Sequence, residues 1–255
     1  MGKVLAVTNQ KGGVGKTTTS VNLAASLVAT KRKVLLIDLD PQGNATMGSG
    51  VNKHALENSI YDVLVDDLSI AQARLATTPG FDLIAANGDL TAAEVELLDM
   101  DDKEQRLKRA LAPVQGEYDY IIIDCPPSLN MLTVNALVAS DSVLIPMQCE
   151  YYALEGLTAL LNTIEKIKSV LNPELEIDGL LRTMYDPRIA LANQVSSQLT
   201  DHFGDKVYRT IIPRNVRLAE APSYGLPGVT FDPSSKGAQA YIAFGAEMVA
   251  RIKKM

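Results

Sequence analysis

The sequence contains no tryptophan, two cysteines and two histidines among its 255 residues. Cys125, Cys149, His54 and His202 do not have the spacing of metal ligands, which argues against a structural zinc site. No apolar run approaches the roughly 18 residues that a membrane-spanning helix needs, and the first residues lack the layout of a signal peptide. We therefore expect a cytoplasmic globular protein with free thiols.

Positive charge is also in short supply. The chain has 24 Lys and Arg residues against 30 Asp and Glu residues, a net charge of −6, which argues against nucleic acid coating the whole surface. Residues 206–255 nevertheless hold eight basic and three acidic residues, a surplus of +5, so residues 1–205 carry −11. This asymmetry indicates a local anionic partner, although a solvated basic face has the same composition.

Short apolar runs rich in β-branched residues alternate with stretches of helical periodicity. Apolar runs of this length are typical of strands buried on both faces of a parallel sheet. We expect strands at 4–7, 34–37, 81–85, 120–123, 142–146, 177–184 and 207–212, and helices at 16–30, 152–171 and 237–254. The alternation predicts an α/β fold in which a mostly parallel, twisted sheet has helices on both faces.

The domain organisation follows from the same pattern. We find no internal repeat and no linker, so residues 1–255 are expected to form a single domain. Residues 43–80 are the least regular part. They contain Gly48 and Gly50 and one helix-like segment at 60–64. The sequence is compatible with a mobile flap in this region.

The segment with the clearest chemistry is Lys11-Gly12-Gly13-Val14-Gly15-Lys16-Thr17-Thr18, which follows the first predicted strand and begins the first predicted helix. Glycines let backbone N–H groups surround phosphates, and the helix N-terminus adds partial positive charge. We expect Lys16 to reach the β and γ phosphates, Thr17 to bind Mg²⁺, and Thr18 to donate to the α phosphate. The segment therefore predicts a P-loop NTPase type of fold that binds ATP and Mg²⁺.

The loop departs from the standard motif in one respect. Gln10 stands where that motif has its first glycine, and a second lysine, Lys11, follows. In this the loop resembles the deviant Walker A motif of the ParA/MinD group of P-loop ATPases. Residues 38–44 (DLDPQGN) resemble the second acidic motif of the ParA branch, and residues 121–128 (IIIDCPPS) resemble its Walker B motif.

The resemblance extends along the whole chain, because 150–156 (EYYALEG) and 212–223 (IPRNVRLAEAPS) are similar to later ParA segments. It is closest to the short chromosomal ParA proteins, also called Soj. Longer plasmid relatives carry an N-terminal helix-turn-helix extension that reads DNA. This sequence starts directly at the first strand, so we expect no such extension.

The resemblance implies an ATP-dependent homodimer that encloses two ATP molecules. Lys11 would reach the nucleotide of the other subunit, where a cation neutralises charge on the transferring phosphoryl group. Asp40 would orient the attacking water, so the implied catalytic residues are Lys11, Lys16 and Asp40. Asp38 and Asp124 would complete the magnesium shell with Thr17. The implied adenine-side contacts are Met184, Pro213 and Asn215.

The family resemblance also implies a role in chromosome or plasmid segregation, in the cytoplasm and associated with the nucleoid. The ATP-bound dimer would bind DNA without sequence preference, and a ParB-like partner of the Spo0J type would stimulate slow, Mg-dependent ATP hydrolysis. Contacts between basic side chains and DNA phosphates make such binding sensitive to salt. The candidate DNA-binding residues are Arg188, Arg214, Arg217 and Lys236. Each of these side chains could equally form an ordinary surface ion pair.

Two other functions use related loops. A MinD-like ATPase at the membrane surface needs a C-terminal amphipathic helix with bulky apolar residues and lysines. The last predicted helix ends in Arg251, Lys253 and Lys254, but its apolar face suits packing against a sheet, so no membrane partner is expected. The nitrogenase iron protein bridges an iron–sulfur cluster with two cysteines per subunit. Cys125 and Cys149 do not lie in segments that resemble its cluster-binding ones.

Overall fold

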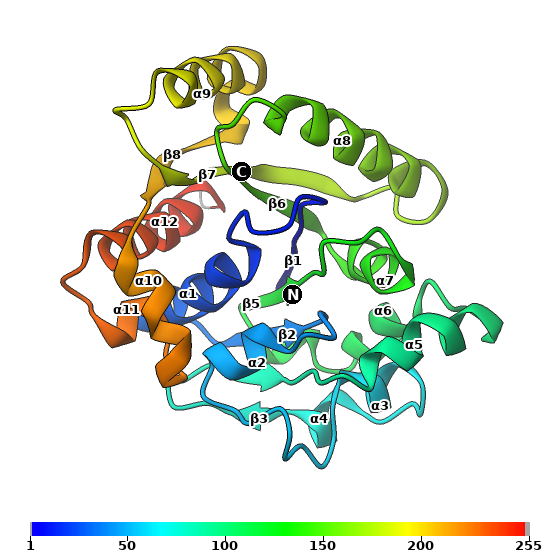
Figure 1. Ribbon diagram of the computed structural model, residues 1–255. Coiled ribbons are helices and arrows are strands. Elements are labelled where there is room, and N and C mark those ends of the chain that lie inside the picture. Colours follow the sequence, from blue (N-terminus) through cyan, green and yellow to red (C-terminus); the bar gives the residue numbers. More distant parts are fainter. Residues whose placement is uncertain (1, 253–255) are drawn as a thin grey trace.

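The computed structural model describes residues 2–252, which form a twisted sheet between two layers of helices (Figure 1). The eight strands lie in the order β3-β4-β2-β5-β1-β6-β7-β8, and every neighbouring pair is parallel except β3 and β4. The strands are β1 (Lys3–Val7), β2 (Val34–Asp38), β3 (Leu75–Ala76), β4 (Asp82–Ile84), β5 (Tyr120–Asp124), β6 (Ser142–Met147), β7 (Glu176–Tyr185) and β8 (Val207–Pro213).

Helices follow most strands and cover both faces of the sheet. They are α1 (Lys16–Ala29), α2 (Asn44–Gly48), α3 (Ile60–Leu64), α4 (Ile70–Ala73), α5 (Leu90–Glu96), α6 (Arg106–Leu111), α7 (Met131–Ala139), α8 (Ala153–Val170), α9 (Ala190–Phe203), α10 (Val216–Glu220), α11 (Gly228–Phe231) and α12 (Lys236–Ile252). Short 3₁₀ turns lie at Leu97–Asp99, Gln115–Glu117, Gly204–Lys206 and Ala221–Tyr224. The predicted α/β architecture is confirmed.

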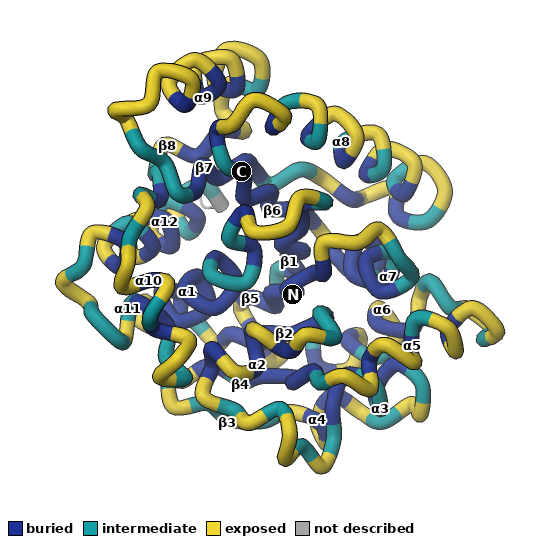
Figure 2. Tube along the Cα trace, viewed as in Figure 1, coloured by how far each residue is buried: buried dark blue, intermediate teal, exposed yellow. Residues whose placement is uncertain are grey.

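Each central strand contributes to two hydrophobic cores. In β1, Val4 and Ala6 join the core under α3, α6, α7 and α8, whereas Leu5 and Val7 join the core under α1 and α12. Successive side chains of a strand point to opposite faces, so a strand covered on both faces must be apolar at every position. This explains why the predicted strands are continuous apolar runs, and Figure 2 shows the central strands buried beneath exposed outer loops.

All seven strands predicted from the sequence are present, with bounds that differ by only a few residues. The three predicted long helices correspond to α1, α8 and α12; residues 253–254 of the last prediction lie outside the described part of the chain. The helix-like segment expected at 60–64 is α3, whereas the short antiparallel strand β3 and the helices α2, α4, α5, α6, α7, α9, α10 and α11 were not predicted. α7 is buried on several faces, so its sequence lacks the polar stripe that marks an amphipathic helix.

Residues 43–80 are exposed in part, but several of their side chains pack into the core, so the segment as a whole is not a loose flap. It forms α2, α3, α4 and β3, and Ile60, Leu64 and Ile70 are at most 1% exposed. α3 begins with a capping box, in which Ser59 accepts from the backbone and Asp62 accepts from the N–H of Ser59. Packing and capping together fix this stretch against the sheet.

The topology brings the candidate site together at one edge of the sheet. β5 lies between β1 and β2, and in their register Asp124 is opposite both Val7 and Asp38. The phosphate-loop candidate follows Val7 directly. The carboxyl ends of parallel strands with diverging connections are where ligands of α/β proteins usually bind.

Candidate functional site

The glycine-rich loop has the backbone that a phosphate cradle requires. Gly13 and Gly15 have φ values of 75° and 86°, a left-handed conformation that glycine adopts without strain. A Cβ atom placed on Gly12 or Gly13 would meet nothing within 4 Å, so the space in front of the loop is open. Thr183 of β7 donates to the carbonyl of Val14 at 2.7 Å and holds the loop in place.

Lys16 opens α1 with its side chain buried, at 7% exposure. Its Nζ donates to the carbonyl of Lys11 at 3.3 Å, which leaves ammonium donors for a ligand. Burial lowers the pKa of Lys16, and the nearby charges of Asp124 and Asp40 oppose that shift. A buried ammonium beside open space fits an anionic ligand.

Asp38 and Asp124 form a fully buried carboxylate pair. Asp38 accepts from the backbone and hydroxyl of Thr46, both at 2.7 Å, and Asp124 accepts from Thr17 at 2.7 Å and Ser20 at 2.8 Å. Burial raises the pKa of Asp38 to about 6, and burial together with the charge of Asp38 raises the pKa of Asp124 to about 7. Such crowding of negative charge is relieved by a cation.

The donor set fits magnesium shared with phosphates. In the described residues, no group of three or more His, Cys, Asp or Glu side chains is placed to hold a metal ion by itself. Mg²⁺ keeps several waters and is usually held by one or two carboxylates plus phosphate oxygens. Asp124, Asp38 and the hydroxyl of Thr17 provide such a partial shell.

A cleft of about 670 Å³ joins the loop to the other predicted residues. Lys16, Thr17, Asp40 and Met184 all line it, although they come from three separate segments of the chain. Asp40 is held at the cleft by its own turn, in which the N–H of Gln42 donates to Asp40 Oδ1 at 2.9 Å. The remaining lining residues are Gly12, Gly13, Gly15, Thr18, Pro41, Gln42, Asn44, Thr91, Glu94, Pro126, Pro127 and Ser128.

Of the three adenine-side candidates, only Met184 lines this cleft. Pro213 ends β8 opposite Tyr185, the neighbour of Met184, so it lies at the same edge of the sheet. Asn215 caps α10 by accepting from the N–H of Leu218 at 3.2 Å, which occupies its side-chain oxygen. The adenine contacts of Pro213 and Asn215 stay predictions.

Lys11 does not point freely into solvent. Its Nζ lies 2.5 Å from Glu150 Oε2 of the same chain, in the loop after β6, and both side chains are largely exposed. An exposed pair of this kind contributes little to stability, so the lysine can exchange partners. The separation of 139 positions along the chain explains why the sequence did not reveal this contact.

The four candidate DNA-binding residues fall into two groups. Arg188 is paired with Asp186 at 2.6 Å, and Arg217 with Glu220 at 2.8 Å. Arg214 and Lys236 are exposed, and within residues 2–252 neither forms an ion pair. The ion pairs that the sequence left open therefore exist for two of the four.

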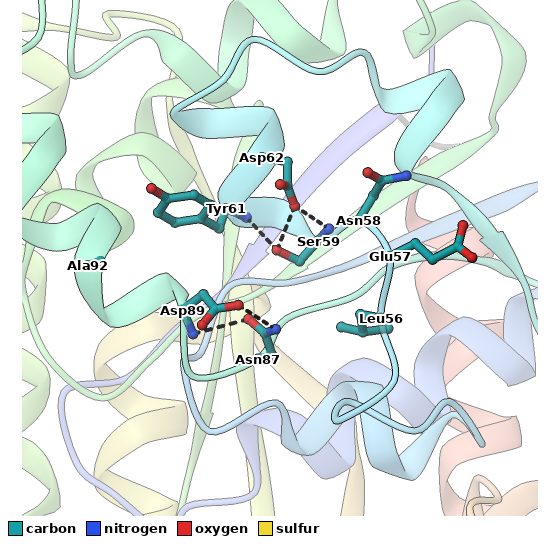
Figure 3. A pocket seen from close by; sticks show the side chains of 9 residues that line it. All are labelled: Leu56, Glu57, Asn58, Ser59, Tyr61, Asp62, Asn87, Asp89 and Ala92. Carbon is teal, nitrogen blue, oxygen red and sulfur yellow. Dashed lines mark hydrogen bonds between the residues drawn. The ribbon is translucent and has the colours of Figure 1, made fainter.

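A smaller pocket of about 320 Å³ lies next to α3 and α5 (Figure 3). Two of its carboxylates are engaged locally: Asp62 in the capping box with Ser59, and Asp89 with the amide of Asn87 at 2.9 Å. Helix capping and turn formation account for these polar groups. None of the predicted site residues lines this pocket.

Comparison with known proteins agrees with the geometry. The sequence model of an AAA domain family matches residues 2–177. The chain is 56% identical to the sporulation initiation inhibitor protein Soj of Bacillus subtilis over 251 residues, which covers 98% of this chain and 99% of Soj. It is 50% identical to the chromosome partitioning protein ParA of Myxococcus xanthus over 252 residues, 98% of this chain and 89% of ParA.

A solved structure is similar over nearly the same length. It is a protein of Mycobacterium smegmatis, described as cobyrinic acid a,c-diamide synthase with bound ADP and magnesium, which is 40% identical. The two superimpose with a TM-score of 0.87 over 99% of this chain and 96% of that one. On the sequence matches, the chain belongs to the Soj/ParA family of chromosome-partitioning P-loop ATPases.

The structure also bears on the two alternative functions. Tyr241, Phe244 and Met248 of α12 are at most 1% exposed, so the apolar face of the last helix packs into the core instead of facing a lipid surface. In residues 2–252 no helix is long and apolar enough to cross a membrane. Cys125 and Cys149 are buried free thiols, which does not suit a cluster shared between two subunit surfaces.

Proposed function

We propose that this chain is a magnesium-dependent ATPase of chromosome or plasmid segregation. Its ATP-bound dimer binds DNA without sequence preference, and a ParB-like partner stimulates hydrolysis and release. The observation that supports the ATPase most strongly is the convergence of Lys16, Thr17, Asp40, Asp38 and Asp124 at one end of the sheet. Similarity to Soj and ParA over almost the whole chain supports the segregation role.

The phosphates of ATP would lie along the loop from Lys11 to Thr18. Backbone N–H groups of the loop and the N-terminus of α1 stabilise negative charge there, and Lys16 adds a charge-assisted hydrogen bond. Mg²⁺ neutralises the β and γ phosphates when it is bound. Thr17 and Asp124 would hold the ion, and Asp38, which lies beside Asp124, would add further negative charge to the site.

Asp40 is the residue that would position the attacking water. It lines the same open cleft as Lys16 and Thr17, and the N–H of Gln42 holds its carboxylate. A carboxylate at that place accepts a hydrogen bond from water and aligns it with the terminal phosphate. Because positioning contributes most of phosphoryl-transfer catalysis, loss of Asp40 would stop turnover while leaving ATP bound.

Dimerisation would depend on ATP through Lys11. When two chains face each other, Lys11 of each would leave Glu150 and reach the nucleotide bound by the other chain. Without phosphates the two facing clefts present lysines to one another, and like charges repel. ATP thus supplies the negative charge that makes the interface favourable.

DNA binding would use the basic residues near the C-terminal part of the chain. Arg214 and Lys236 have their charges available, whereas Arg188 and Arg217 must exchange carboxylates for phosphates. Exposed ion pairs are weak, so such exchange costs little. A protein of this kind would be cytoplasmic and associated with the nucleoid.

The proposed ATPase is tested by measuring phosphate release from Mg-ATP and, in parallel, the molar mass with ATP by light scattering. The wild-type chain should release phosphate slowly and form dimers with ATP but not with ADP. Asp40→Ala should form the dimer without phosphate release. Glu94→Ala, which removes another carboxylate from the same cleft, is the matched control and should retain turnover. Normal turnover by Asp40→Ala would remove Asp40 from the proposed role.

A further inference from the structure

A second cavity adjoins the nucleotide cleft. Its volume is about 300 Å³, and it separates α1 and α2 from the segment that contains α10 and α11. Thr17, Thr18 and Asn44 line both the cleft and this cavity. On the far side the cavity is bounded mainly by apolar residues, which are Leu218, Ala221, Pro222, Leu226, Pro227 and Gly228. A ligand at the cleft therefore touches one wall of a space whose other wall is the α10–α11 segment.

Asn22 bridges these two walls. It is 3% exposed on α1, its Nδ2 donates to the carbonyl of Thr18 at 2.8 Å, and its Oδ1 accepts from the N–H of Val229 in α11 at 3.0 Å. Within residues 2–252 this is the one hydrogen bond that joins α1 to residues 214–235. The cavity lies along the same boundary, with Thr17, Thr18 and Asn44 on one side and mainly apolar residues on the other.

Around Asn22 the packing is tight. A Cβ on Gly228 would come within 2.4 Å of Leu218 Cδ2 and within 3.1 Å of Asn22 Oδ1. α11 therefore presses on both Asn22 and the buried side chain of Leu218 in α10. Movement of α11 must displace α10, because close-packed interiors transmit such shifts.

α11 also leads to a residue of the proposed DNA-binding surface. The helix is followed by Asp232, whose carboxylate lies 3.4 Å from the guanidinium of Arg217 in α10. Arg217 is held at its other side by Glu220. The place of Arg217 on the surface, and its distance from Asp232, thus depend on the relative positions of α10 and α11.

We propose that Asn22 is a positioning residue that couples occupancy of the nucleotide cleft to the placement of Arg217. The inference rests on the proposed function, since it assumes that Arg217 contacts DNA in the ATP-bound form. A ligand at Thr18 shifts the first turn of α1, the two hydrogen bonds of Asn22 carry the shift to α11, and the adjoining cavity gives the segment room to move. The quantity that Asn22 controls is the gain in DNA affinity that ATP produces.

The test measures the affinity for a non-specific DNA duplex twice, once with a non-hydrolysable ATP analogue and once with ADP. The quantity compared is the ratio of the affinity with the ATP analogue to the affinity with ADP. Asn22→Ala removes the bridge from one side. Val229→Pro removes the donor from the other side, in the first turn of α11, where a helix tolerates proline. Ser26→Ala is the matched control, because it deletes a buried 2.7 Å hydrogen bond of α1 without touching α11.

We expect both bridge variants to lower the ratio about three- to tenfold, the loss typical of one hydrogen bond, while Ser26→Ala keeps it. Affinity for the ATP analogue without DNA should change less than the ratio does. An unchanged ratio in both bridge variants would overturn the inference, as would an equal loss in Ser26→Ala or an equally large loss of ATP affinity. If the wild-type ratio itself is one, the proposed function fails before the variants are compared.

Discussion

The buried carboxylates at the ends of β2 and β5 predict that replacing one of them changes the free energy of unfolding by an amount that depends on pH. Asp124 is fully buried beside Asp38, and burial with the neighbouring charge raises its pKa from 3.8 to about 7. The substitution Asp124→Asn removes this ionisation while nearly preserving side-chain shape. We expect it to stabilise the ligand-free, metal-free protein at high pH and to disable magnesium-dependent turnover.

The magnitude follows from the pKa shift and the local hydrogen bonds. Each pKa unit corresponds to about 1.4 kcal/mol, so an ionised Asp124 costs the fold on the order of 4 kcal/mol at about pH 8. An asparagine can keep the neighbours satisfied, since Ser20 Oγ also donates to the carbonyl of Lys16 at 3.0 Å and can accept from an amide. Burial of the amide offsets part of the gain, which leaves about 2 kcal/mol, or roughly 4–8 °C in melting temperature.

The sign of the change in stability with pH follows from proton linkage. Because the pKa of Asp124 is raised in the folded state, its contribution to stability is complete below pH 3.8 and is lost as the pH rises through about 7. The metal-free wild type should therefore lose stability between about pH 5 and about pH 8, and the variant should lose less.

The assay is urea unfolding of both proteins in a chelator at the two pH values. The difference in free energy of unfolding between Asp124→Asn and wild type should be small at the lower pH and favour the variant at the higher one. Asp40→Asn is the control, because Asp40 lies at the open cleft and is not fully buried. A variant that is less stable than wild type at the higher pH would refute the reasoning.

Three further substitutions separate the proposed roles. Lys16→Ala should weaken ATP binding at least about tenfold, as loss of a charge-assisted hydrogen bond predicts, and unchanged affinity in calorimetry would contradict the phosphate-loop assignment. Lys11→Ala should bind ATP as a monomer but fail to dimerise, so an ATP-dependent dimer of this variant in light scattering would exclude the role in trans. Arg217→Glu should weaken DNA binding while sparing dimerisation, and an unaltered salt dependence would clear Arg217 of phosphate contact.

The sequence predicted the parts of the site that depend on local chemistry. Gly13 and Gly15 occupy left-handed backbone positions, so the loop could be recognised from residue types and order alone. The strands could be recognised because a sheet covered on both faces requires unbroken apolar runs, as in β5. Asp38 and Asp124 were expected at strand ends, and the register of β2 with β5 places them side by side.

The parts that sequence reasoning missed depend on contacts between distant segments. Thr46 holds Asp38, and Thr183 holds the carbonyl of Val14 across 169 residues; a threonine carries no signal of its own for such a task. Helix α9 has a buried stripe with helical spacing, but a helix of mixed polarity is hard to recognise without its neighbours. The pairing of Arg188 with Asp186 required the turn geometry that follows β7.

The central claim is that ATP switches this chain into a DNA-binding form. The most direct measurement is binding to a non-specific DNA duplex with ATP, with ADP and without nucleotide, each at a low and a high salt concentration. The account predicts tight binding only with ATP, and weaker binding at high salt because contacts to phosphates release counterions. Absence of DNA binding in every nucleotide state, with ATP hydrolysis intact, would contradict it.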